Sequence, residues 1–132
     1  MKQNLSLTVI LAMCTMMGAL GIDTYLPSFY AIGQEFEAPT AAVQQTLSVY
    51  VLAMAVTMLF YGSLSDTFGR RRVLLFSSLG YALTSCVAAF VSSIEGLVLI
   101  RFAQGAMAGS GMVVARAIVQ DRFQGADAQR MM

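Results

Sequence analysis

The chain has 132 residues, of which 58% are hydrophobic and only 11% are charged, with a formal net charge of +1. Soluble domains carry about 25% charged residues, so the composition excludes a water-soluble globule and indicates a lipid bilayer as the solvent. The near-neutral charge offers no basic face for a nucleic acid, and the absence of His with only two Cys leaves almost no metal ligands or catalytic bases. We therefore expect no metal, no cofactor and no enzymatic activity.

Four helices are predicted from the spacing of the charges. No charged residue occurs in 3–22, 38–65 or 73–94, and each interval reaches the roughly 20 residues that a helix needs to cross the hydrocarbon. A fourth apolar interval is interrupted only by Arg101. The sequence thus predicts an all-α membrane protein with four transmembrane helices at about residues 5–33, 41–63, 71–92 and 93–118.

The first helix contains an acidic residue, Asp23, shortly before Pro27. Apolar residues continue beyond the proline, so we expect the helix to run to about Gly33 and to hold Asp23 inside the membrane. An intramembrane carboxylate costs about 2.5–3.5 kcal/mol and usually serves a function. Two alternatives are an interfacial Asp23, if the helix ends at Pro27, and a cleaved signal peptide, which Met13 before Cys14 and the three further spans disfavour.

A short charged turn follows the second helix. It carries Gly62, Asp66, Gly69, Arg70 and Arg71 in a run that begins GSLSDTFGRR. We expect Gly62 to let the second helix end close to a neighbour, Gly69 to permit a tight reversal, and Asp66 to pair with Arg70 across the loop. The alternative is a set of solvated charges that only fix the topology, because exposed pairs contribute about 0–1 kcal/mol.

The fourth helix is expected to begin near Ser93, because Ser92 to Glu95 fits the capping box. Counted at about 1.5 Å per residue, Arg101 then lies at nearly the same depth as Asp23. We expect the two charges to face a shared polar cavity or each other. The alternative for the arginine is a side chain that snorkels to the outer headgroups.

The fourth helix also carries a small-residue pair, Gly105 and Gly109, in the GxxxG spacing. Small residues at this spacing allow the backbones of two membrane helices to approach closely. We therefore expect a tightly packed neighbour on this face.

The basic residues predict the orientation. Seven of the eight lie before the first helix, in the turn after the second helix or at the end of the fourth, and the eighth is Arg101. The remaining two linkers contain only acidic charges. Since cytoplasmic loops are enriched in Lys and Arg, we expect both termini and the turn near Gly69 to be cytoplasmic.

Three motifs resemble the major facilitator superfamily. The order G-x-L-x-D-x-x-G-R-R from Gly62 to Arg71 resembles the signature loop between helices two and three of that family. The stretch from Gly21 to Pro27 resembles the end of helix one in the Bcr/CflA group of drug:proton antiporters. The helix-four motif of proton-coupled antiporters is similar to Leu97, Arg101, Gln104 and Gly105, with Met107 as a departure where Gly is common.

The resemblance implies that residues 1–132 form the N-terminal part, the first third, of a twelve-helix major facilitator domain that is incomplete at its C-terminus. It implies proton-coupled efflux of drugs or small metabolites by alternating access across the bacterial inner membrane. Asp23, Arg101 and Gln104 would couple protons to substrate, and Arg70 would meet Asp121 at the cytoplasmic gate. The expected partners are the bilayer, a small-molecule substrate, protons and the missing C-terminal helices, and the chain alone is expected to be inactive.

Two other functions remain open at this point. One is a four-helix exporter similar to the small multidrug resistance family that acts as an antiparallel dimer, although dual topology needs a weaker cation bias. The other is a non-transporting membrane subunit that binds partner helices through the face of Gly105. The second alternative predicts that neutralising Asp23 leaves function intact.

Overall fold

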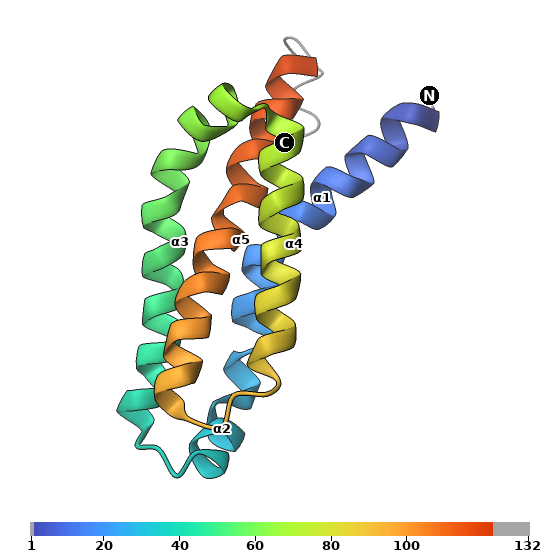
Figure 1. Cartoon of the computed structure of the whole chain (residues 1–132). Helices are drawn as coiled ribbons and strands as arrows, with labels where there is room; N and C mark the ends of the chain where they lie inside the picture. The colour runs from blue at the N-terminus through green and yellow to red at the C-terminus, as the bar shows by residue number, and fades with distance from the viewer. Residues whose placement is uncertain (1, 123–132) are drawn as a thin grey trace.

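The computed structural model describes residues 2–122, with side chains from Leu5 onward, and all regular structure in this part is helical (Figure 1). The side chains of Lys2 and Arg130, two of the cations used to predict the orientation, lie outside the described residues. The helices are α1 (Lys2–Asp23), the 3-10 turn η1 (Leu26–Ser28), α2 (Phe29–Glu35), α3 (Thr40–Phe68), α4 (Arg70–Ala88) and α5 (Ile94–Arg122).

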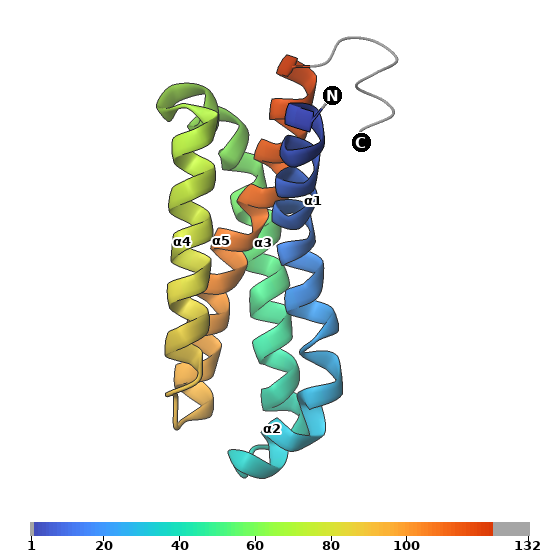
Figure 2. The ribbon, with the colours of Figure 1, turned by 90° about the vertical axis from the view of Figure 1, so that its right-hand side faces the viewer.

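Helix α5 is the axis of the bundle. Helices α1, α3 and α4 each pack against α5, whereas α3 and α4 make few contacts with each other (Figures 1 and 2). The N-terminal half of α1 leans away from the other helices (Figure 1). The start of α1, the α3–α4 turn and the end of α5 lie at one end of the bundle, and α2 lies at the other (Figures 1 and 2).

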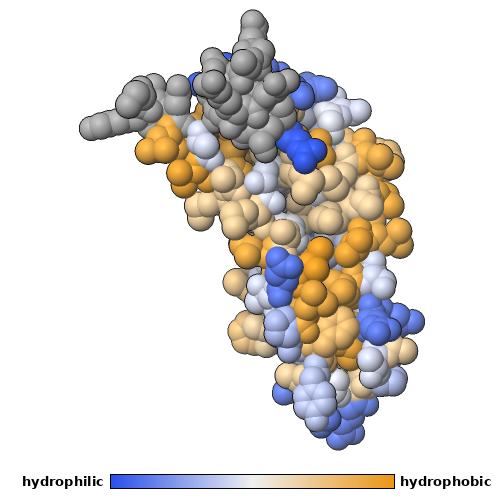
Figure 3. Space-filling model, turned by 180° about the vertical axis from the view of Figure 1, so that it is seen from behind, coloured by the Kyte–Doolittle hydropathy of each residue, from blue (hydrophilic) through white to orange (hydrophobic). Residues whose placement is uncertain are grey.

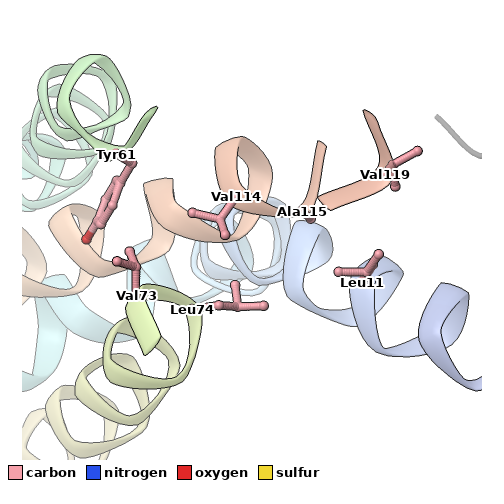
Figure 4. Packing of buried hydrophobic residues seen from close by; sticks show 7 residues of the cluster. All are labelled: Leu11, Tyr61, Val73, Leu74, Val114, Ala115 and Val119. Carbon is pink, nitrogen blue, oxygen red and sulfur yellow. The ribbon is translucent and has the colours of Figure 1, made fainter. Parts of the chain in front are cut away.

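The core lies around the second half of α5. Figure 4 shows Leu11 of α1, Tyr61 of α3 and Leu74 of α4 gathered around Val114 and its neighbours on α5. Val114 is fully buried. Residues of α1, α3 and α4 therefore pack together against α5.

Glycines on α5 allow this close packing. A Cβ on Gly105 would overlap the backbone carbonyl oxygen of Tyr50 in α3, and a Cβ on Gly109 would lie 3.0 Å from the carbonyl oxygen of Met54. On the other side, a Cβ on Gly111 would overlap the carbonyl oxygen of Cys14 in α1. The structure therefore places α5 in backbone contact with α3 and α1.

Three segments of the described chain are long and apolar enough to cross a membrane: Leu5–Glu35, Thr40–Phe68 and Ile94–Arg122. In the most apolar 18-residue stretch of each segment, 50% of the third segment is buried, compared with 11% of the first and 17% of the second. This difference is expected because the third segment is the central helix, α5. Helix α4 does not meet the same criterion, because its first turn consists of three arginines. Figure 3 shows that the face seen from behind is largely hydrophobic, with hydrophilic residues midway and at the lower tip.

The first predicted helix, 5–33, is longer than expected but not continuous. It bends between Asp23 and Leu26, continues as η1 over Pro27 and then as α2 to Glu35. Proline lacks the N–H that a continuous helix would require at this point. The α-helix therefore ends at Asp23, and the chain continues over the proline as the separate elements η1 and α2.

The second helix was expected to end at residue 63, but it continues to Phe68. Gly62 and Asp66 are therefore helical, and the predicted loop is reduced to Gly69, which has a φ of 91°. A Cβ on Gly62 would meet nothing within 4 Å, so the close approach expected at this glycine is not observed among the described residues. A single interior glycine costs a helix only about 0.5–1 kcal/mol, too little to end one.

The last two predicted helices also differ at their ends. The third begins at Arg70 and ends at Ala88 rather than spanning 71–92, and the fourth runs from Ile94 to Arg122 rather than 93–118. The Ser93 side chain accepts a hydrogen bond from the backbone N–H of Gly96 at 3.2 Å. Ser93 is thus the N-cap, one residue later than the capping box expected from Ser92 to Glu95.

Candidate functional site

Arg101 is a buried cation in the half of the bundle nearer α2. The residue is 8% exposed. Its guanidinium carbon lies 3.6 Å from the ring centroid of Tyr25 and 5.4 Å from that of Tyr50. Its Nη1 donates hydrogen bonds to the Gly21 carbonyl oxygen and to Oε1 of Gln104, both at 3.3 Å. Aromatic faces and carbonyl dipoles thus hold the positive charge.

Neighbouring side chains fix this arrangement. Gln104 is 6% exposed, and its Nε2 donates to the Ser85 hydroxyl of α4 at 3.0 Å. The Tyr50 hydroxyl donates to the Gly18 carbonyl oxygen of α1 at 3.2 Å. The Tyr25 hydroxyl shares a hydrogen bond with Thr46 of α3. We call the set of Tyr25, Tyr50, Ser85, Arg101 and Gln104 the Arg101 cluster, and it joins α3, α4 and α5 to the residues that follow α1.

No carboxylate pairs with Arg101 among residues 5–122, where both ion pairs belong to Arg70. A buried cation without a counter-charge is costly unless its hydrogen bonds are satisfied. Every buried side-chain nitrogen and oxygen in the described part of the chain has a partner. The Arg101 cluster therefore gives Nη1 of the guanidinium two acceptors but places no carboxylate beside the positive charge.

Asp23 does not join the Arg101 cluster. Its side chain is exposed, and it is not among the residues that line the pocket beside Arg101. Successive helical residues are rotated by about 100°, so Asp23 points about 200° away from Gly21, whose carbonyl accepts from Arg101. The expectation that Asp23 and Arg101 face each other or one cavity is thus not met within the described helices.

A pocket of about 610 Å³ adjoins the Arg101 cluster. Ligand sites in proteins commonly have volumes of about 300–1,000 Å³ and combine apolar walls with a few polar groups. This pocket has that mixture, with hydroxyl groups, aromatic rings and one guanidinium among apolar side chains. Residues that line it include Gly21, Thr24, Tyr25, Tyr81, Leu97 and Arg101.

A second charged cluster lies at the opposite end of the bundle. Arg70 Nη2 lies 3.1 Å from Asp66 Oδ1 and donates to Asp121 Oδ1 at 3.4 Å, while its Nε donates to the other oxygen of Asp121. Its Nη1 also donates to the Ser65 hydroxyl at 3.3 Å. Both expected partners of Arg70 are therefore present. We call Ser65, Asp66, Arg70 and Asp121 the Arg70 cluster, and it ties together the ends of α3, α4 and α5.

The remaining predicted site residues have other surroundings. Arg71 is exposed and makes no ion pair with a described residue. Gly105 lies one position after Gln104 and brings α5 against Tyr50, so the tight packing also positions one of the two rings near Arg101. Sequence reasoning missed Tyr50 and Ser85, which no local pattern distinguishes from other polar residues in apolar helices.

Comparison with known proteins supplies the family. Residues 11–132 match the Major Facilitator Superfamily. The chain is 40% identical over 124 residues to the uncharacterized MFS-type transporter YdgK of Bacillus subtilis, covering 94% of this chain and 31% of the relative. It is 31% identical over 122 residues to a bicyclomycin resistance protein homolog of Haemophilus influenzae, covering 92% and 31%.

A third relative is the multidrug resistance protein MdtL of a Shewanella species, 45% identical over 101 residues, which cover 76% of this chain and 26% of MdtL. No solved structure matches the chain. The chain spans about a third of the length of these curated relatives, whose names describe transport or resistance. The family match covers most of the chain, and the chain therefore belongs to the major facilitator superfamily.

Proposed function

We propose that this chain supplies the N-terminal helices of a transporter that exports drugs or small metabolites across the bacterial inner membrane in exchange for protons. The chain covers about a third of its relatives, so the proposal concerns a longer transporter and assigns no transport to these helices alone. The observation that carries the proposal is the Arg101 cluster. Among the described residues, only neutral groups contact this buried guanidinium, and it lines a pocket of about 610 Å³. A positive charge in such a place is suited to bind a ligand.

The proposal includes α4 as a fourth span and places both termini in the cytoplasm. Residues 73–94 contain no charge, and α4 runs alongside α5 between the same two ends of the bundle (Figures 1 and 2). The arginines of its first turn would then lie at the cytoplasmic headgroups, as positively charged loops do in membrane proteins. This orientation puts the Arg70 cluster on the cytoplasmic side and the Arg101 cluster in the outer half of the membrane.

In this mechanism Asp23 carries the proton, while Arg101, on a different side of α1, lines the pocket that would hold the substrate. Asp23 lies two residues from Gly21, and its side chain is exposed on the described bundle, where other helices of the longer transporter could contact it. Movement of those helices would change the surroundings of Asp23 and so release or take up its proton. Gln104, held by Ser85, orients the guanidinium.

The Arg70 cluster acts as the cytoplasmic latch of this mechanism. Its two carboxylates are 64% and 56% exposed, and its arginine side chain is 27% exposed. Exposed ion pairs contribute only about 0–1 kcal/mol each. Such contacts can hold the helix ends in one conformation and still break in every transport cycle.

The test uses the longer transporter in membrane vesicles with an imposed proton gradient, and bicyclomycin as the probe. Asp23→Asn should abolish drug-dependent proton flux, because the amide cannot carry a proton, and Asp23→Glu should restore part of it. Glu35→Gln, an exposed acid at the end of α2, is the matched control and should leave the flux intact. Export by Asp23→Asn at the wild-type rate would overturn the proposed proton role.

A further inference from the structure

A groove lies between α3 and α4, on a different side of the bundle from the Arg101 pocket. Helices α3 and α4 both pack on α5 but have little contact with each other, and the space between them has a volume of about 570 Å³. Leu64 and Phe68 form the α3 wall, and Phe76 belongs to the α4 wall. These three side chains are 41%, 59% and 74% exposed. The groove is therefore apolar and open at the surface.

Met107 of α5 lies at the inner end of the groove. Its Sδ lies 3.0 Å from the position that a Cβ on Gly80 would occupy, so the thioether is seated against α4 where a side chain is missing. The groove consequently does not continue along the whole length of α4. The α4 residues that line the groove all precede Gly80.

A cation lines the groove near the α3–α4 turn. Arg72 is exposed, and neither of the ion pairs of the described chain includes it. Arg70, two residues earlier, differs because two carboxylates contact it. The groove thus offers one uncompensated positive charge at its mouth and aromatic and aliphatic side chains inside.

We propose that this groove binds an anionic phospholipid of the cytoplasmic leaflet. The lipid phosphate would pair with Arg72, and an acyl chain would lie along Phe68, Phe76 and Met107. Basic pockets between membrane helices on the cytoplasmic side favour anionic headgroups. An apolar helix in the groove would instead cover Arg72 without neutralising it, which is costly. The inference rests on the membrane orientation in the proposed function, but not on transport.

The test is native mass spectrometry of the purified chain in detergent with added phosphatidylglycerol or phosphatidylcholine. The wild type should retain phosphatidylglycerol in preference to phosphatidylcholine. Arg72→Gln should lower phosphatidylglycerol retention about fivefold, the value for one basic residue near an anionic surface. Arg71→Gln is the matched control, because it removes the same charge one residue away, outside the groove lining, and it should retain the lipid. Arg72→Lys should restore most of the binding.

Three results would overturn the proposal. Equal losses in Arg71→Gln and Arg72→Gln would show general surface electrostatics rather than a site. Equal retention of the two lipids would show that the groove binds acyl chains without selecting the headgroup. Full displacement of the lipid by glycerol 1-phosphate would show an anion site that does not use the groove. Because no transport is measured, failure here leaves the proposed function standing, and failure of transport leaves the lipid site standing.

Discussion

Two arginines of this bundle have opposite surroundings. Arg101 is 8% exposed and is held by an aromatic face, a backbone carbonyl and a side-chain amide. Arg70 has a side chain that is 27% exposed and contacts two carboxylates at the ends of α3 and α5. The charge of Arg70 is thus neutralised at a more exposed helix end, whereas the nearly buried charge of Arg101 has no carboxylate beside it among the described residues.

The difference indicates different tasks. Ion pairs at a water-exposed helix end are weak and reversible, which suits a latch. A buried cation without a carboxylate has a strong electrostatic effect on any acid or ligand that approaches, because the surrounding dielectric is low. Substitutions that disturb the surroundings of Arg101 should therefore cost more stability than substitutions near Arg70.

The largest loss of stability is expected where backbone packing supports the Arg101 cluster. Gly105→Ala places a methyl group on the Tyr50 carbonyl oxygen, so α3 and α5 must separate. We expect a loss of about 3 kcal/mol in the free energy of unfolding, as for severe overpacking, measured by denaturation in mixed detergent micelles. Gly62→Ala is the control, since nothing lies within 4 Å of the added methyl group, and it should not lower stability. Equal effects of the two variants would contradict the packing described for α5.

Two substitutions of Tyr25 distinguish the contribution of its ring to stability from that of its hydroxyl. Tyr25→Leu removes the ring that lies 3.6 Å from the guanidinium carbon, whereas Tyr25→Phe keeps the ring and removes only the bond to Thr46. Because a desolvated cation–π contact contributes about 2 kcal/mol, Tyr25→Leu should be less stable than Tyr25→Phe by about that amount. The same denaturation assay measures both variants, and identical stabilities would show that the ring does not hold the charge.

The α3–α4 turn next to the Arg70 cluster depends on one glycine. Gly69 has φ 91° and ψ 132°, a conformation that side chains disfavour. Gly69→Ala should therefore cost about 1 kcal/mol in unfolding free energy, with open space around the new methyl group excluding a steric cause. A variant as stable as the wild type would show that the turn relaxes to another conformation.

The smallest effect is expected from the latch itself. Asp121→Asn removes one of two carboxylates from Arg70 and should lower the unfolding free energy by less than about 1 kcal/mol. The loss should shrink further at high salt, because exposed charges are screened. A loss of several kcal/mol that persists in salt would contradict the assignment of this cluster as a weak, reversible contact.

The two clusters also differ in how well the sequence predicts them. Asp66 and Arg70 are four residues apart, so their pairing follows from local spacing, whereas the pairing of Arg70 with Asp121 is implied by the family resemblance. The sequence also predicts helices on both sides of the turn, but not that α3 continues through Gly62 to Phe68, because an interior glycine is only a weak stop signal.

The Arg101 cluster is less accessible to sequence reasoning. Burial of Arg101 and its contact with Gln104 follow from the apolar interval and the spacing of three residues. Tyr50 and Ser85 come from other helices, and their contacts depend on how α3 and α4 pack on α5. The expected partner Asp23 faces away, because depth along a helix predicts a shared level but not a shared face.

The most direct test of the account compares the two arginines by one measurement, the rate of proton-gradient-driven export by the longer transporter in vesicles. Arg101→Gln should reduce export to the background of empty vesicles, since the pocket loses its buried charge. Arg70→Gln should retain measurable export, since only a weak latch is lost. Export by Arg101→Gln at the wild-type rate would contradict the claim that the Arg101 cluster is the working site of these helices.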